Sequence, residues 1–207
     1  MISVHGIYAV LGVDKCLALP MFHAFTGCDT VSSYSGKGKK TAWETWNVFP
    51  EVTDTFLSLM RQPQQSDVQN AMGVLERFVV LLYDKTSCRS HVNEARLDLF
   101  TRKARDILNI PPTQGCLIEH VRRAAYQAGY CWSQSLVPLP DVSQPNEWGW
   151  MGTAKPAWKV MWSKLPEASK VCRELISCGC LKGCRTNCKC KKAALPCTAL
   201  CKCTGSC

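Results

Sequence analysis

Nine of the fifteen cysteines in this 207-residue chain are crowded between residues 178 and 207. They are Cys178, Cys180, Cys184, Cys188, Cys190, Cys197, Cys201, Cys203 and Cys207. The spacing C-x3-C-K-C begins at Cys184 and begins again at Cys197, so the segment contains an internal repeat. Apart from a few leucines and alanines it has no apolar side chains, and it cannot bury a hydrophobic core of its own. Its fold must therefore depend on sulfur.

Disulfides are a poor explanation for this tail. Nine is an odd number, a C-x-C pair closes a strained ring, and residues 1–13 carry neither a basic leader nor a cleavage site typical of secretion. Zinc fits better. Two separate tetrahedral sites leave one cysteine unused, whereas three ions need twelve zinc–sulfur bonds, which nine thiolates supply if three of them bridge. We therefore expect three zinc ions and a tail that unfolds without metal.

The tail also carries most of the positive charge. The formal net charge is +9, and the tail has six basic residues and no Asp or Glu. These residues are Lys182, Arg185, Lys189, Lys191, Lys192 and Lys202. A basic cluster favours a polyanion as partner, although a solvated lysine surface has the same composition. We expect DNA as the partner and the nucleus, or otherwise the cytoplasm, as the location; protein partners are left open.

The order and spacing of the nine cysteines resemble the tesmin-type CXC, or cysteine-rich, domain. This resemblance implies three zinc ions on nine cysteines and contact with DNA. The best-known members carry two modules and a tyrosine that enters the minor groove, whereas this chain has one module and Asn187 at that position. The resemblance therefore implies attachment through basic side chains. A metallothionein-like zinc-binding tail on a helical interaction domain, and a zinc knot without DNA contact, remain alternatives.

The preceding sequence predicts a mostly α-helical body over residues 1–136. Apolar residues recur at helical spacing over 68–82, 92–108 and 117–128. Ser66 and Thr113 are the expected N-caps of the first and third helices, and Arg122 and Arg123 are expected on the outer face of the third. The four histidines are not at metal-ligand spacing and are expected to be packing or surface residues.

Three further segments complete the predicted organisation. Residues 137–166 are rich in Pro and Trp and are expected to pack on the body in extended form. Residues 167–177 predict a short helical connector, and 178–207 form the small, irregular zinc-cluster domain. The longest strongly apolar run, 78–83, is far shorter than the roughly 20 residues that cross a bilayer, so no membrane partner is expected.

A glycine-rich hairpin at 27–46 is the second candidate site. Its candidate phosphate contacts are Gly36, Lys37, Gly38, Lys39 and Lys40. The nucleotide P-loop pattern fails, because Ser33 stands at the first glycine position and Lys40 at the Ser/Thr position. Backbone N–H groups before a helix and adjacent lysines suit a nucleic-acid phosphate instead. A glycine-rich loop in which Asp29 caps the turn is the structural alternative.

The stretch from Phe25 to Ala42 resembles the flap endonuclease/XPG family. That resemblance implies Asp29 as a ligand of Mg²⁺ or Mn²⁺, Gly36, Gly38 and Lys39 as a phosphate grip, and a body that is the C-terminal portion of a nuclease-like α/β domain. The family's other carboxylates lie upstream, and only 28 residues precede Asp29. We therefore expect a partial or degenerate nuclease relative without activity as this chain stands. The whole chain also resembles uncharacterised animal proteins that look mobile-element-derived.

Overall fold

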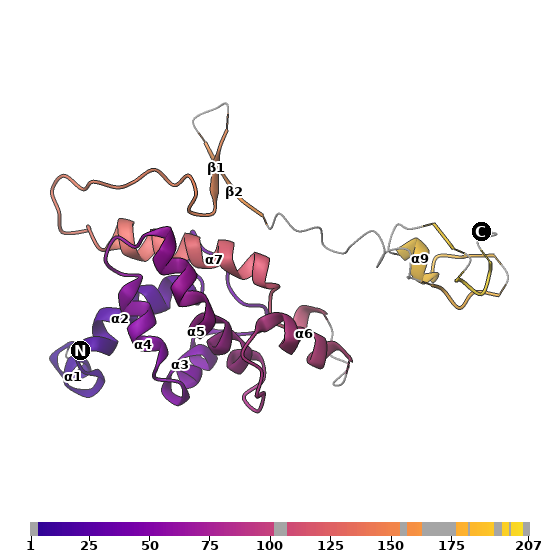
Figure 1. Ribbon diagram of the computed structural model, residues 1–207, viewed down its shortest axis with the longest axis horizontal. Coiled ribbons are helices and arrows are strands. Elements are labelled where there is room, and N and C mark those ends of the chain that lie inside the picture. Colours follow the sequence, from indigo (N-terminus) through magenta and orange to yellow (C-terminus); the bar gives the residue numbers. More distant parts are fainter. Residues whose placement is uncertain are drawn as a thin grey trace. The chain divides into compact units, whose positions relative to one another are not determined.

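The chain divides into two compact units, Met1–Ser163 and Lys164–Cys207 (Figure 1). The structure is a computed structural model, and it describes residues 4–101, 107–153, 157–162, 177–181, 183–192, 196–198 and 200–204. The predicted connector over 167–176 lies outside these residues.

The first unit is mainly helical, as predicted (Figure 1). Its elements are α1 (Val4–Leu11), α2 (Val13–Phe25), α3 (Lys39–Val48), α4 (Val52–Ser58), α5 (Gln65–Tyr83), α6 (Val92–Thr101), the 3₁₀ helix η1 (Ile107–Asn109), α7 (Gln114–Tyr126), the π-helix η2 (Gln127–Trp132) and strands β1 (Trp150–Gly152) and β2 (Trp158–Val160). Within the described residues the only sheet is the antiparallel β1–β2 pair, with Met151 opposite Lys159. The nuclease-like α/β alternative stays a prediction.

Helix α5 forms the centre of the body, and its apolar stripe is buried as predicted. Most of its second half is buried, from Phe78 to Tyr83. The predicted N-cap at Ser66 is wrong, because the cap is Gln64. The Asp67 carboxylate accepts a hydrogen bond from the Gln64 backbone N–H at 2.7 Å and closes a reciprocal capping box. Helix α5 therefore begins one residue before the expected cap.

An aromatic cluster joins α2, α3 and α4. The rings of Phe22 and Trp46 are stacked with centroids 4.8 Å apart, and the Phe56 ring meets Trp46 edge-on at 5.4 Å. Trp46 is fully buried, and its indole N–H donates to the Thr53 hydroxyl at 2.9 Å. The one polar atom of this large side chain is thus satisfied inside the core.

Glu76 is a buried carboxylate that ties three helices together. It lies on α5 and accepts hydrogen bonds from the Val92 backbone N–H at 2.9 Å and the Gln114 side-chain amide at 2.8 Å. Val92 and Gln114 are the first residues of α6 and α7. Negative charge near helix N-termini is favourable, because backbone N–H groups there lack helical acceptors.

The structure confirms the predicted N-cap of α7, but it does not place Arg123 on the outer face of this helix. The Thr113 hydroxyl accepts from the Cys116 backbone N–H at 3.3 Å. Arg123, expected to face solvent, is only 6% exposed and donates to the carbonyls of Gly149 at 3.3 Å and Met161 at 3.2 Å. The prediction is wrong because the Trp-rich segment returns across this face of α7.

The Trp-rich segment packs on the body through its first tryptophan. Trp148 is buried against the Tyr130 ring, with centroids 5.2 Å apart. The next residue is Gly149, with φ +79°, and a Cβ there would lie 2.7 Å from the Glu119 carbonyl oxygen. Only glycine suits this crossing. Trp162, in contrast, is 77% exposed.

Among the described residues no single helix is both long enough and apolar enough to span a membrane. Helices α1 and α2 meet both conditions only as a pair, and they are bent by 103° at the break between them.

His120 is a buried core residue whose protonation should destabilise the body. Its Nε2–H donates to the Phe25 carbonyl at 2.8 Å, and Nδ1 lies 2.9 Å from the Ser32 hydroxyl. Burial, with a smaller contribution from Arg123, lowers its pKa from 6.5 to about 4. Between pH 6.5 and about pH 4 the unfolded chain therefore binds more protons than the folded chain. The free energy of unfolding falls as the pH drops through this range.

The expected loss from pH 7 to pH 4 that is due to His120 is about 3 kcal/mol. Urea unfolding followed by far-UV circular dichroism measures it, with His120→Gln as the comparison. The variant should lose less stability over this pH range than the natural chain. Equal losses would show that His120 is not held in its neutral form.

Candidate metal centre

The described cysteines of the second unit lie together at distances that suit a shared metal. The Cys178 sulfur lies 3.8 Å from each of the sulfurs of Cys184, Cys197 and Cys203. Two thiolates on one tetrahedral zinc ion are about 3.8 Å apart when each Zn–S bond is about 2.3 Å long. A disulfide would require about 2.05 Å. The sulfur geometry therefore fits zinc, and these cysteines are all free.

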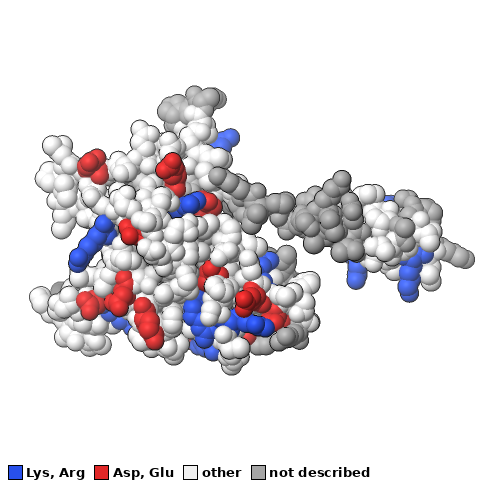
Figure 2. Space-filling view, in the orientation of Figure 1, with Lys and Arg blue, Asp and Glu red and all other residues white. Residues whose placement is uncertain are grey.

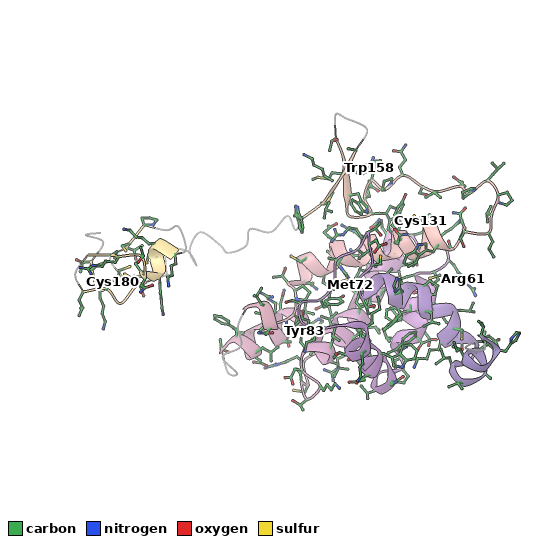
Figure 3. The ribbon with its side chains drawn as sticks, turned by 180° about the vertical axis from the view of Figure 1, so that it is seen from behind. Arg61, Met72, Tyr83, Cys131, Trp158 and Cys180 are labelled. Atoms are coloured by element: carbon green, nitrogen blue, oxygen red, sulfur yellow. The ribbon has the colours of Figure 1, made fainter. Side chains whose placement is uncertain are left out.

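Eight cysteines form three overlapping groups of four, and the ligand atoms of each group lie within 4.8 Å of one another. The groups are Cys178–Cys180–Cys184–Cys188, Cys178–Cys188–Cys190–Cys197 and Cys178–Cys197–Cys201–Cys203. Cys180, which belongs only to the first group, is labelled in Figure 3. Cys178 belongs to all three groups, and Cys188 and Cys197 to two each. Cys207 lies outside the described residues.

Backbone N–H groups stabilise two of these sulfurs as thiolates. The Cys201 sulfur accepts from the backbone N–H groups of Cys178 and Thr198, both at 3.4 Å, and these bonds lower its pKa to about 6. A backbone hydrogen bond from Lys191 is the main cause that lowers the pKa of Cys188 to about 6. Burial instead raises the pKa of Cys190 to about 12. A bound cation is what would deprotonate such a thiol at neutral pH.

The basic residues of the tail point outward while the sulfurs are buried. Helix α9 (Lys189–Lys192) presents exposed Lys189, Lys191 and Lys192 around the buried Cys190. Arg185 and Lys202 are also exposed, and Lys182 lies outside the described residues. In Figure 2 the described part of this unit shows blue basic side chains and no red acidic ones. The tail thus has a sulfur interior and a cationic surface.

The glycine-rich hairpin uses one of its predicted phosphate contacts for its own structure. The Lys39 ammonium donates to the carbonyls of His23 at 3.0 Å and Gly27 at 2.8 Å, and to the Thr26 hydroxyl at 2.9 Å. It therefore caps the C-terminal end of α2, where cations are favourable.

The other hairpin residues form the turn that leads into α3. Gly38 is the N-cap of α3, and Gly36 has φ +66° in the turn before it. The Lys37 ammonium lies 5.2 Å from the Tyr83 ring centroid, and Lys40 is exposed. Their contact with phosphate stays a prediction.

Asp29 is exposed in the loop after α2. Among the described residues it belongs to no group of three or more metal-ligating side chains, and every such group consists of cysteines from the second unit. The structure therefore brings the predicted zinc ligands together, but it gathers no carboxylates around Asp29 in the part of the chain that it describes. Its role as a ligand of Mg²⁺ or Mn²⁺ stays a prediction.

No protein-family model, curated protein or solved structure matches this chain.

Proposed function

We propose that this chain is a zinc-dependent DNA-binding protein that attaches to the phosphate backbone through a three-zinc cysteine tail. The observation that carries the proposal is the set of three overlapping cysteine groups. Each supplies four sulfurs, the number that structural zinc prefers, and their overlap allows a limited number of sulfurs to serve several ions. A nuclear location belongs to the same proposal.

The overlap also suggests which cysteines bridge. Cys188 and Cys197 each serve two groups, and Cys178 serves three. Cys207 could replace Cys178 as the fourth ligand in one of the three groups. Cys178, Cys188 and Cys197 would then each bind two ions, and each of the other six cysteines would bind one. That assignment satisfies three tetrahedral ions with nine thiolates. Native mass spectrometry of the full chain should then detect three zinc ions, whereas a larger and variable load would favour metal storage.

The zinc ions would act as cross-links and the lysines as the DNA contacts. The charges of nine thiolates and three zinc ions sum to −3, and the six basic residues of the tail outweigh this. The lysines of α9 are exposed on a frame that the sulfurs would hold in place. Each phosphate contact releases counterions from the DNA, so binding should weaken steeply with salt.

Replacing the three α9 lysines by alanine tests the DNA proposal. Lys189→Ala, Lys191→Ala and Lys192→Ala together should reduce the slope of log affinity against log salt by about 3, since each phosphate contact contributes about 0.9. Fluorescence anisotropy with duplex DNA from 50 to 200 mM salt measures this slope.

A matched control removes three exposed cations from the body, by Arg61→Ala, Lys85→Ala and Lys159→Ala. It lowers the net charge equally and should leave the slope nearly unchanged. Equal effects of the two triple variants would mean that overall charge, and not the tail, attracts DNA. Absent binding by the zinc-loaded chain would favour storage or a purely structural knot.

A further inference from the structure

The first unit contains a cavity of about 270 Å³ that the proposed DNA contacts do not use. It lies between the loop 32–35, the end of α5 at Tyr83, which is labelled in Figure 3, helix α6, the turn 110–112 and helix α7. The volume equals that of about nine water molecules in the liquid. It is slightly smaller than sites for drug-sized ligands, which begin at about 300 Å³.

Two residues that line this cavity each have a buried polar atom with no hydrogen-bond partner. These atoms are the Tyr34 hydroxyl and the Glu119 Oε2, and both residues are only 6% exposed. The Tyr34 ring is held between Phe25 and His120, at centroid distances of 5.5 and 5.0 Å. Buried polar groups in folded proteins are nearly always paired, so two unpaired atoms in residues that line one cavity call for an explanation.

The charge of the wall favours an anion. Arg96 donates to the Pro111 carbonyl, and no carboxylate pairs with it among the described residues. Arg123 also lines the cavity, and its Nη1 is shared between two carbonyls. Among the described residues of the wall Glu119 is the one acidic residue, and its Oε1 is already 2.7 Å from Arg122. Two guanidinium groups and one carboxylate leave the cavity net positive.

Three serines, Ser32, Ser33 and Ser35, also line the cavity, and much of the remaining wall is apolar. Ile110, Pro111, Pro112 and Trp162 contribute hydrocarbon and aromatic surface. A ligand that fits must therefore combine an apolar body with polar groups at defined positions, as is usual for small-molecule sites.

We propose that this cavity binds a small organic carboxylate that has an apolar ring and an N–H donor. The carboxylate pairs with Arg96. The buried Glu119 Oε2 accepts from the donor, and the Tyr34 hydroxyl gains a partner, after small rotations of these two side chains. The ring lies against the prolines. This proposal does not rest on the zinc tail, so either can fail without the other.

Titration of the full zinc-loaded chain with indole-3-acetate and its neutral analogue indole-3-acetamide tests the proposal. Both have the same ring and N–H donor, and only the acetate carries the charge. The acetate should bind at least tenfold more tightly, and amide shifts in a ¹H–¹⁵N spectrum should concentrate at residues 32–35 and at the lining residues Leu108 and Ile110. Equal affinities, or no saturable shifts with either probe, would overturn the proposal.

Three substitutions distinguish the contact between Arg96 and the carboxylate from general effects on the protein. Arg96→Gln should weaken acetate binding about tenfold and leave acetamide binding nearly unchanged, whereas Arg61→Gln, which removes an exposed arginine outside the cavity, should affect neither. Tyr34→Phe should weaken both probes and should raise the melting temperature without ligand, because it removes an unpaired buried hydroxyl. This second variant remains informative if Arg96→Gln misfolds. Equal losses in Arg61→Gln and Arg96→Gln, or unchanged probe binding in Tyr34→Phe, would refute the site.

Discussion

Cys178→Ser should remove more zinc than Cys180→Ser. Cys178 belongs to all three cysteine groups, whereas Cys180 belongs to one. Loss of a shared thiolate breaks several sites at once, and structural zinc contributes about 10 to 16 kcal/mol of apparent folding free energy in small zinc domains. We expect three ions in the natural chain, two in Cys180→Ser and one or none in Cys178→Ser, as measured by native mass spectrometry.

The matched control for this experiment is Cys88→Ser. Cys88 is an exposed free cysteine of the first unit, and its loss should leave the zinc count at the natural value. A second measurement is hydrogen exchange of the tail amides, which should lose their protection in Cys178→Ser and after chelation. Identical zinc counts in Cys178→Ser and Cys180→Ser would contradict the shared-ligand arrangement.

Trp46→Ala should be the most destabilising single substitution that we predict for the helical body, by about 3 to 5 kcal/mol. The side chain is fully buried, stacks on Phe22 and donates to Thr53. Its removal leaves a cavity where α2, α3 and α4 meet and leaves the Thr53 hydroxyl without its donor. Urea unfolding monitored by far-UV circular dichroism gives the change in free energy.

Trp162→Ala is the control, because this tryptophan is 77% exposed. Its cost should stay within about 0.5 kcal/mol, the usual range for surface substitutions. Comparable losses in the two variants would mean that the aromatic cluster does not carry the stability assigned to it here.

The local features of the fold could be predicted from the sequence. The apolar stripes of α5 and α7 and the Thr113 cap depend on residues within a few positions of one another, and the structure confirms them. The gathering of the tail cysteines was also predictable, because thiolate spacing and the lack of apolar residues leave metal as the main source of folding energy. The number of ions and DNA contact stay predictions.

The contacts that the sequence does not predict join residues that are far apart in the chain. Arg123 is buried against two backbone carbonyls that lie 26 and 38 residues further along the chain. Lysines next to glycines suit phosphate binding, but the Lys39 ammonium donates to the carbonyls of His23 and Gly27 at the end of α2. Glu76 is buried beside the first residues of α6 and α7, which begin 16 and 38 residues further along the chain. No local pattern encodes such contacts.

The sulfur interior of the tail has a thermal consequence. The heat-capacity increase on unfolding comes from exposing apolar surface, and this interior consists of cysteines with few hydrocarbon groups around them. Cooling weakens the hydrophobic contribution to the aromatic core of the body, but a metal–thiolate cluster would be almost insensitive to it. In the cold, therefore, the body should approach denaturation while the tail keeps its structure.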